Sequence, residues 1–180
     1  MRNRGRSWAT GLSALLIGGV VPAGVAAQTK VDDAEIAQIV VTANAIDVKQ
    51  GELAVTRAAD ARVKRFAETM IADHNAVNKA AGELVARLGV TPRASDVSRS
   101  LEASAAERME ELAAKRGAAF DRAYIANEVA YHRAVLEALD GLLIPNASDA
   151  ELKKTLEGVR PAFEAHLRHA ESIQAALGGS

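Results

Sequence analysis

The stretch "VTPRASDVSRSLEASAAERMEELAAKRG", residues 90–117, joins two pairs of predicted long helices. It starts with turn-forming residues and then contains an apolar pattern that predicts a shorter helix near Leu101–Arg116. Four helices that simply alternate in direction need only a short loop at this point. A connection this long can run the whole length of a bundle. It therefore predicts that the second and third long helices are parallel.

The chain before this stretch contains the first two long helices. The first begins after Asp32 or Asp33, either of which can cap free N–H groups, and runs to about Ala59. Asp60 caps the second helix, which ends where Gly89 can take the left-handed conformation. The short joint between them predicts an antiparallel hairpin.

The chain after this stretch contains the second pair. The third long helix covers about Ala118–Asp140, or a few residues more. Three turn-forming residues follow it: Gly141, Pro145 and Asn146. A capping box of Ser148 and Glu151 opens the last helix, which runs to about Leu177 and is expected to bend at Pro161. The sequence thus predicts an all-α, ferritin-like four-helix bundle: two antiparallel hairpins joined by a long crossover that contains a short helix.

Composition excludes several classes of function. The chain has no cysteine, so it has neither disulfides nor a thiolate nucleophile or ligand. Its net charge is −1 and no basic block occurs, which gives nucleic-acid binding no electrostatic support. After the first apolar run, no second run is long enough to form a transmembrane segment in the mature chain.

The first 27 residues are typical of a secretory signal peptide. Three arginines precede an apolar, uncharged run from Trp8 to Ala27. Val25 and Ala27 fit the small-residue cleavage rule, so Gln28 is expected to begin the mature domain of residues 28–180. An uncleaved membrane anchor is the alternative, and the glycines and proline within the run argue against it. The predicted location is the periplasm, with or without association to the envelope.

Three of the four histidines lie on rows of core-facing residues. In the second helix, steps of four and three residues join Val63, Ala67, Met70, His74, Val77, Ala81, Leu84 and Leu88. His132 and His166 occupy matching rows in the third and fourth long helices, and Asp47 does so in the first. Measured from the bundle end near Asp60, the four residues lie within about one helical turn of the same height, provided that the topology is ferritin-like.

This convergence has two interpretations. Three imidazoles in a dry space lack acceptors, and each unsatisfied polar group costs roughly 1–3 kcal/mol. A divalent transition metal bound by Asp47, His74, His132 and His166 would satisfy them, and the ligand types suit zinc, copper or iron. The alternative is a polar network in which Asp47 charges one imidazole and water links the others.

Three further residues bear on the site and on the packing of the helices around it. Glu128 lies one turn before His132 and either adds a ligand or flanks the core. His169 is expected at the surface or at the edge of the core-facing row. Gly51 inside the first helix costs stability relative to alanine and indicates a close approach between helices.

Four segments resemble the bacterial domain-of-unknown-function family 4142 (DUF4142). They are "DVKQGELA" (47–54), "VKRFAETMIADHNAVN" (63–78), "FDRAYIANEVAYH" (120–132) and "RPAFEAHLRHA" (160–170). The resemblance covers nearly all of the mature chain and implies an exported, ferritin-like fold. It also implies that the aspartate and the three histidines hold the family's characteristic polar positions. It implies no settled activity.

The chain departs from the di-iron carboxylate proteins of the same fold. Those proteins use Glu-x-x-His on two helices. Here Ile71 precedes His74 by three residues and Phe163 precedes His166 by three, and neither can bind a metal. In the DUF4142 family that the chain resembles, the position of Asp47 is usually glutamate. These departures argue against ordinary di-iron oxidase or iron-storage chemistry.

The sequence favours an exported helical-bundle protein that binds a transition metal in its core and serves metal handling or the stress response. The first alternative is a non-enzymatic structural or interaction module of the cell envelope, whose histidines only specify packing. An oxidoreductase that uses the same site is a third, less favoured hypothesis. The sequence identifies no protein partner.

Overall fold

The computed structural model describes residues 30–178, and this part of the chain is helical apart from short connections. The predicted all-α fold is confirmed. The elements are α1 (Asp33–Arg57), α2 (Ala61–Leu88), α3 (Asp96–Ala113), α4 (Gly117–Ala138), the π-helix η1 (Leu139–Leu143), α5 (Ile144–Asn146) and α6 (Ala150–Gly178). The predicted signal peptide lies outside the described residues. No helix within 30–178 is long and apolar enough to cross a membrane.

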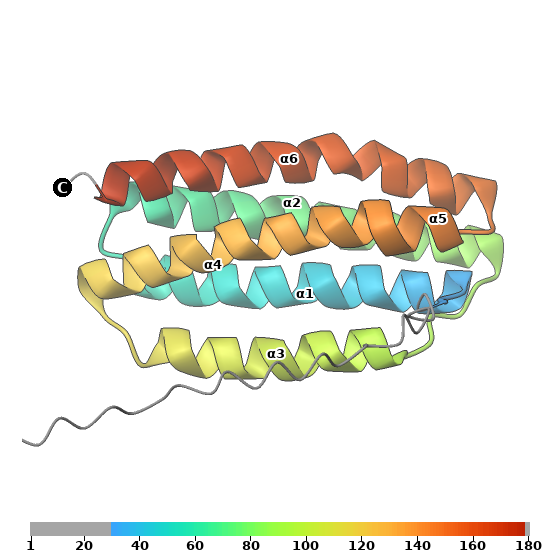
Figure 1. Cartoon of the computed structure of the whole chain (residues 1–180), viewed down its shortest axis with the longest axis horizontal. Helices are drawn as coiled ribbons and strands as arrows, with labels where there is room; N and C mark the ends of the chain where they lie inside the picture. Colours follow the sequence, from blue (N-terminus) through green and yellow to red (C-terminus); the bar gives the residue numbers. More distant parts are fainter. Residues whose placement is uncertain (1–29, 179–180) are drawn as a thin grey trace, which may run out of the picture.

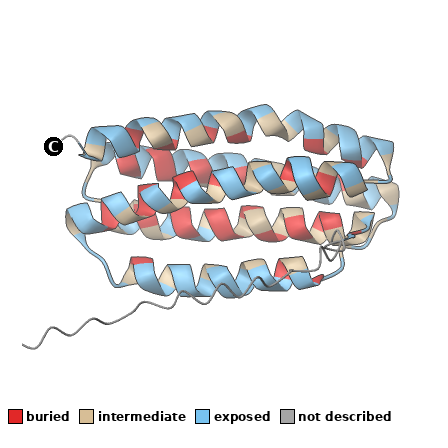
Figure 2. Ribbon diagram, in the orientation of Figure 1, coloured by how far each residue is buried: buried red, intermediate tan, exposed pale blue. Residues whose placement is uncertain are grey.

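The four long helices form two antiparallel hairpins, α1 with α2 and α4 with α6 (Figure 1). The crossover α3 runs back along the outside of α1, so that α2 and α4 point in the same direction (Figure 1). This is the ferritin-like connection that the length of residues 90–117 predicts. Most residues of α3 face solvent, whereas the buried faces of the other long helices turn toward one another (Figure 2).

Helix ends follow local capping, and two predicted bounds of the crossover helix are wrong. Asp32 closes a capping box with Glu35 at the start of α1, and Gly89 ends α2 at a φ of 66°. The crossover helix begins at Asp96 instead of near Leu101, because Ser95 forms a capping box. It also ends at Ala113, three residues before the predicted Arg116.

The predicted turn after α4 lies further along the chain. Gly141 lies inside the π-helix η1, and Pro145 lies inside α5, which follows η1 without a break, so the chain stays helical to Asn146. The predicted capping box of Ser148 and Glu151 is also wrong. Oδ1 of Asp149 instead accepts the backbone N–H groups of Glu151 at 2.8 Å and of Leu152 at 2.9 Å. Helix α6 then continues through Pro161.

Each hairpin turn is held by a carboxylate from the other hairpin. Asp121 of α4 accepts the backbone N–H groups of Ala59 at 3.0 Å and Asp60 at 2.9 Å, in the α1–α2 turn. Asp33 of α1 accepts those of Ser148 at 2.8 Å and Asp149 at 3.1 Å, in the α5–α6 turn. The two turns therefore lock the hairpins together at opposite ends of the bundle.

The apolar core has two parts, with buried polar residues between them. The part near the α1–α2 turn contains Phe66, Phe120 and Tyr124, each fully buried. The other part, around Leu84 and Leu156, borders an apolar cavity of about 300 Å³.

Gly51 lies where α1 and α2 approach closely, as the sequence predicts. A Cβ atom at this position would lie 2.9 Å from Cγ1 of Ile71 and 3.2 Å from the backbone oxygen of Ala67. Gly51→Ala is therefore expected to destabilise the fold by about 1–3 kcal/mol through overpacking. Gly82→Ala is the matched control, because nothing lies within 4 Å of its added Cβ, and it should stabilise α2 by about 0.5–1 kcal/mol. Urea unfolding measures both. Equal effects of the two substitutions would contradict the close approach.

Candidate metal centre

Four helices bring the four predicted site residues together in the middle of the bundle. Asp47 comes from α1, His74 from α2, His132 from α4 and His166 from α6, and their exposed fractions are 0, 1, 0 and 9%. The imidazole ring centroids lie 5.3–5.7 Å apart. One nitrogen of each ring lies within 4.8 Å of one nitrogen of the other two. His169 is exposed and packs edge-on against Phe66, so it lies outside this group.

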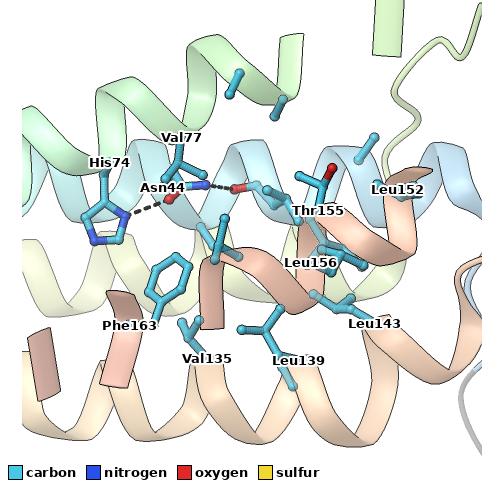
Figure 3. A pocket seen from close by; sticks show the side chains of 18 of the residues that line it. Asn44, His74, Val77, Val135, Leu139, Leu143, Leu152, Thr155, Leu156 and Phe163 are labelled. Atoms are coloured by element: carbon cyan, nitrogen blue, oxygen red, sulfur yellow. Dashed lines mark hydrogen bonds between the residues drawn. The ribbon is translucent and has the colours of Figure 1, made fainter. Parts of the chain in front are cut away.

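Each imidazole uses one nitrogen for a hydrogen bond on the outer side of the cluster. Nδ1 of His74 lies 2.6 Å from Oδ1 of Asn44, whose amide group donates to the carbonyl of Val40 (Figure 3). Oδ1 of Asn44 is therefore the acceptor, and Nδ1 of His74 carries the proton. In the same way, Nδ1 of His132 donates to the carbonyl of Glu128 at 3.0 Å.

Asp73 provides the outer partner of the third histidine. Nε2 of His166 lies 3.0 Å from Oδ2 of Asp73, and this carboxylate oxygen accepts a hydrogen bond from the Nε2–H group. The sequence places Asp73 on another face of α2 from His74, and only the packing of α2 against α6 shows that it reaches His166. Outer acceptors of this kind fix the tautomer and orientation of metal-binding histidines. Asn44 and Asp73 are thus functional candidates that sequence reasoning missed.

The inner atoms of the cluster are buried without hydrogen-bond partners. They are Nε2 of His74, Nε2 of His132, Nδ1 of His166 and both carboxylate oxygens of Asp47. With the tautomers set from outside, the three inner nitrogens carry lone pairs, and those of His74 and His132 lie beside the carboxylate of Asp47. Groups that only accept hydrogen bonds repel one another at this range, so the arrangement needs a cation or additional protons.

The distances match two ligands of one ion. Nε2 of His74 and Oδ2 of Asp47 are 2.9 Å apart, yet they lack the alignment of a hydrogen bond. Nε2 of His132 lies 3.7 Å from the same oxygen. Two ligands bound at about 2.0–2.1 Å and separated by about 90° to 109° lie about 2.9–3.4 Å apart. The His74–Asp47 pair therefore has the spacing of neighbouring ligands, and a small movement would bring His132 to it.

Glu128 forms a second group of candidate ligands with Asp47 and His132, whose ligand atoms lie within 4.8 Å of one another. Its carboxylate is fully buried and both oxygens lack a hydrogen-bond partner. Burial, and then the negative charge of Asp47, raise the pKa of Glu128 well above its ordinary value. A cation bound nearby would reverse this preference. In the sequence, Glu128 is marked as a candidate by its position one turn before His132. The sequence does not show that its carboxylate is fully buried.

Burial favours the neutral form of His132 and His166, which is the form that binds metals. It lowers the pKa of His132 from 6.5 to about 4, against the opposing effect of Asp47. Burial also lowers the pKa of His166, although Asp73 opposes this. These histidines thus remain available as ligands below the pH at which an exposed histidine would be protonated.

The low pKa of His132 predicts how acid destabilises the metal-free protein. The unfolded chain takes up a proton near pH 6.5 and the folded chain only near pH 4, so stability falls as the pH drops between these values. The full difference is worth about 3 kcal/mol. His132→Gln should lack this contribution, and His169→Gln should retain it. The contribution of Glu128 to stability has the opposite pH dependence and is present in all three proteins. The quantity to measure is therefore the difference in unfolding free energy between wild type and His132→Gln at each pH. Parallel unfolding curves over this range would contradict the prediction.

The fold and the buried cluster define a ferritin-like helical bundle with a histidine and carboxylate centre in its core. The chain belongs to the family described as domain of unknown function DUF4142, whose model matches residues 20–173. Among curated proteins, no sequence matches it.

Two solved structures share the fold. One is a DUF305 protein of Streptomyces coelicolor whose description suggests secretion. It is 16% identical, with a TM-score of 0.68 over 81% of this chain and 93% of the other. The second is CopM in its Cu(II)-bound form, 13% identical, with a TM-score of 0.62 over 82% of this chain and 99% of the other. At these identities the likeness shows the fold alone.

Proposed function

We propose that this protein binds one transition metal ion through Asp47, His74, His132 and His166 and serves metal handling in the cell envelope. The supporting observation is that the two nitrogens of each imidazole have different surroundings. One nitrogen is fixed by an outer acceptor, and the other is buried without a hydrogen-bond partner. The inner nitrogens of His74 and His132 also lie 2.9 and 3.7 Å from Oδ2 of Asp47. A structural network would be expected to satisfy the inner nitrogens as well.

The ligand set indicates which metals to expect. Three imidazoles and a carboxylate suit zinc or divalent copper, and iron is a further candidate. The chain has no cysteine and only three methionines, so the soft ligands that select monovalent copper are scarce. The copper-bound state of CopM, which shares the fold, makes divalent copper a natural first ion to test.

Burial of all four residues favours metal handling over catalysis. A catalytic metal keeps one position open for water or substrate. Here the most exposed of the four is His166 at 9%, and the others are at 1% or less. This leaves the structural alternative, in which the cluster binds no metal and only specifies packing, as the main competitor.

Metal analysis of the purified protein tests the proposal. The protein would be isolated without a histidine tag from the periplasm, and metal content determined by mass spectrometry together with a variant in which His74, His132 and His166 are replaced. About one equivalent of metal in the wild type and none in the variant is the expected result. Equal, substoichiometric metal in both proteins would favour the structural alternative.

The proposed location rests on residues 1–27, which have the composition of a signal peptide. Intact-mass measurement of the exported protein should show a chain that starts near Gln28. A full-length product extracted from membranes would instead indicate an uncleaved anchor and would change the proposed location.

Asp73 provides a test of metal binding that leaves all four ligands in place. Removing an outer partner of a metal-bound histidine typically weakens metal affinity by about 10–100-fold. Asp73→Ala is therefore expected to weaken binding of Cu(II) or Zn(II) by this factor in a competition titration with a chelator. Asp96→Ala is the control, because Asp96 is an exposed aspartate on α3. Unchanged affinity in Asp73→Ala would mean that His166 does not bind the metal.

A further inference from the structure

The apolar cavity beside the metal centre offers a ligand almost only apolar side chains. Its inner end is formed by His74, Asn44 and Phe163 (Figure 3). Asn44 is hydrogen-bonded to His74 and to the carbonyl of Val40.

The two hydroxyl groups of the lining also donate hydrogen bonds within the protein. The Tyr131 hydroxyl donates to the carbonyl of Ala43, and the Thr155 hydroxyl donates to the carbonyl of Glu151. Water needs two to four polar partners to remain in a cavity. This cavity therefore suits an apolar occupant and excludes a chain of ordered water.

The cavity is long. Along α2 its lining extends from His74 to Val85, which corresponds to a length of about 16 Å. A cavity of about 150 Å³ holds one benzene, so this one, at about 300 Å³, has room for about a dozen carbon atoms. A dozen carbon atoms spread over about 16 Å correspond to a single extended alkyl chain.

Small residues let the cavity reach the surface. Ala76 and Ala80 of α2 line it and are themselves exposed. Longer side chains at these positions would cover the cavity from outside. The lining therefore combines a deep apolar interior with an entrance flanked by alanine.

We propose that this cavity binds a single unbranched alkyl chain of about a dozen carbons, the chemistry of a fatty acid tail. Such a chain would contact the apolar lining along its whole length, because its length, volume and apolarity match those of the cavity. The site is separate from the metal ligands, apart from the outer edge of the His74 ring, so the proposal does not depend on a bound metal.

A series of straight-chain fatty acids tests the proposal on the metal-free, full mature protein in the presence of a chelator. The rise in Tm should grow with chain length from six carbons to about twelve and then stop. Decanoate should raise Tm, whereas adamantane-1-carboxylate, an acid of similar carbon number but with a rigid cage, should not. Equal effects of the two acids, or a rise that continues through sixteen carbons, would indicate detergent-like binding and overturn the proposal.

Variants that fill the cavity provide the second arm. Ala81→Leu from α2 and Ala138→Leu from α4 both place a larger side chain in the lining, and each should remove the decanoate shift. Ala86→Leu is the matched control, because Ala86 is exposed and does not line the cavity, and it should keep the shift. Two filling variants guard against one that fails to fold. If both fold and both retain the decanoate shift, the chain does not bind in this cavity. A loss of metal binding elsewhere would leave these outcomes unchanged.

Discussion

His74→Ala is expected to abolish the rise in melting temperature that zinc or copper gives the wild-type protein. A metal that binds only the folded chain stabilises it by about 4 kcal/mol when its free concentration is about 1,000 times Kd. For a domain of this size, that corresponds to about 8–16 °C. His132→Ala and His166→Ala should have the same effect, and Asp47→Ala should weaken the rise. Differential scanning fluorimetry measures each variant against its own metal-free state, which separates metal binding from any loss of packing.

His169→Ala is the internal control for this series. His169 is exposed on α6, three residues beyond His166, and its replacement should leave the metal effect almost intact. The rise should also shrink as the pH falls, because protons compete with the metal for the imidazoles. If the variant without His74, His132 and His166 shows the same rise as the wild type, the metal binds elsewhere and the core cluster is structural.

Glu128→Gln is expected to stabilise the metal-free protein at neutral pH by about 1–3 kcal/mol. Burial raises the pKa of this carboxyl group well above its ordinary value of 4.5, so the folded state keeps a proton that the unfolded chain releases. The associated stability is present below pH 4.5 and is lost as the pH rises. Glutamine has nearly the same shape and no charge, so it removes this dependence. Melting temperatures at pH 4 and pH 8 should agree with wild type at the lower pH and exceed it at the higher one.

The metal-bound state distinguishes two roles for Glu128. If Glu128 is a ligand beside Asp47, Glu128→Gln should reduce the metal-dependent stabilisation while raising the metal-free stability. Glu107→Gln, an exposed site on α3, is the control and should change neither quantity. A loss of metal-free stability at pH 8 would show that Glu128 is ionised and held by a positive partner, against the direction of its pKa shift.

The sequence predicts the bundle and the meeting of the four site residues because both depend on periodicity. Rows of three and four residues place one polar side chain of each long helix inside, and the length of residues 90–117 sets helix direction. Contacts between helices are harder to predict. Asp73 reaches His166 only because α2 and α6 pack side by side, and the burial of Glu128 depends on all four helices.

The prediction for the turn after α4 is wrong for a different physical reason. Glycine and proline usually end a helix, and the sequence predicts that Gly141 and Pro145 do so. Gly141 lies inside the π-helix η1 and Pro145 lies inside α5, so the chain stays helical to Asn146. Glycine and proline in the sequence therefore predict that a turn follows α4. They do not predict its position, because the helix can continue past them, here through a π-helix.

The carboxylates that hold the two hairpin turns have a consequence for the speed of folding. Helical bundles usually fold fast because most of their contacts are local in sequence. Here Asp121 meets Ala59 and Asp60 across 62 and 61 residues, and Asp33 meets Ser148 and Asp149 across 115 and 116. Neither turn is complete until the other hairpin has arrived, so a half-chain should gain little structure alone. We expect a single slow, all-or-none folding step in which both hairpins dock together.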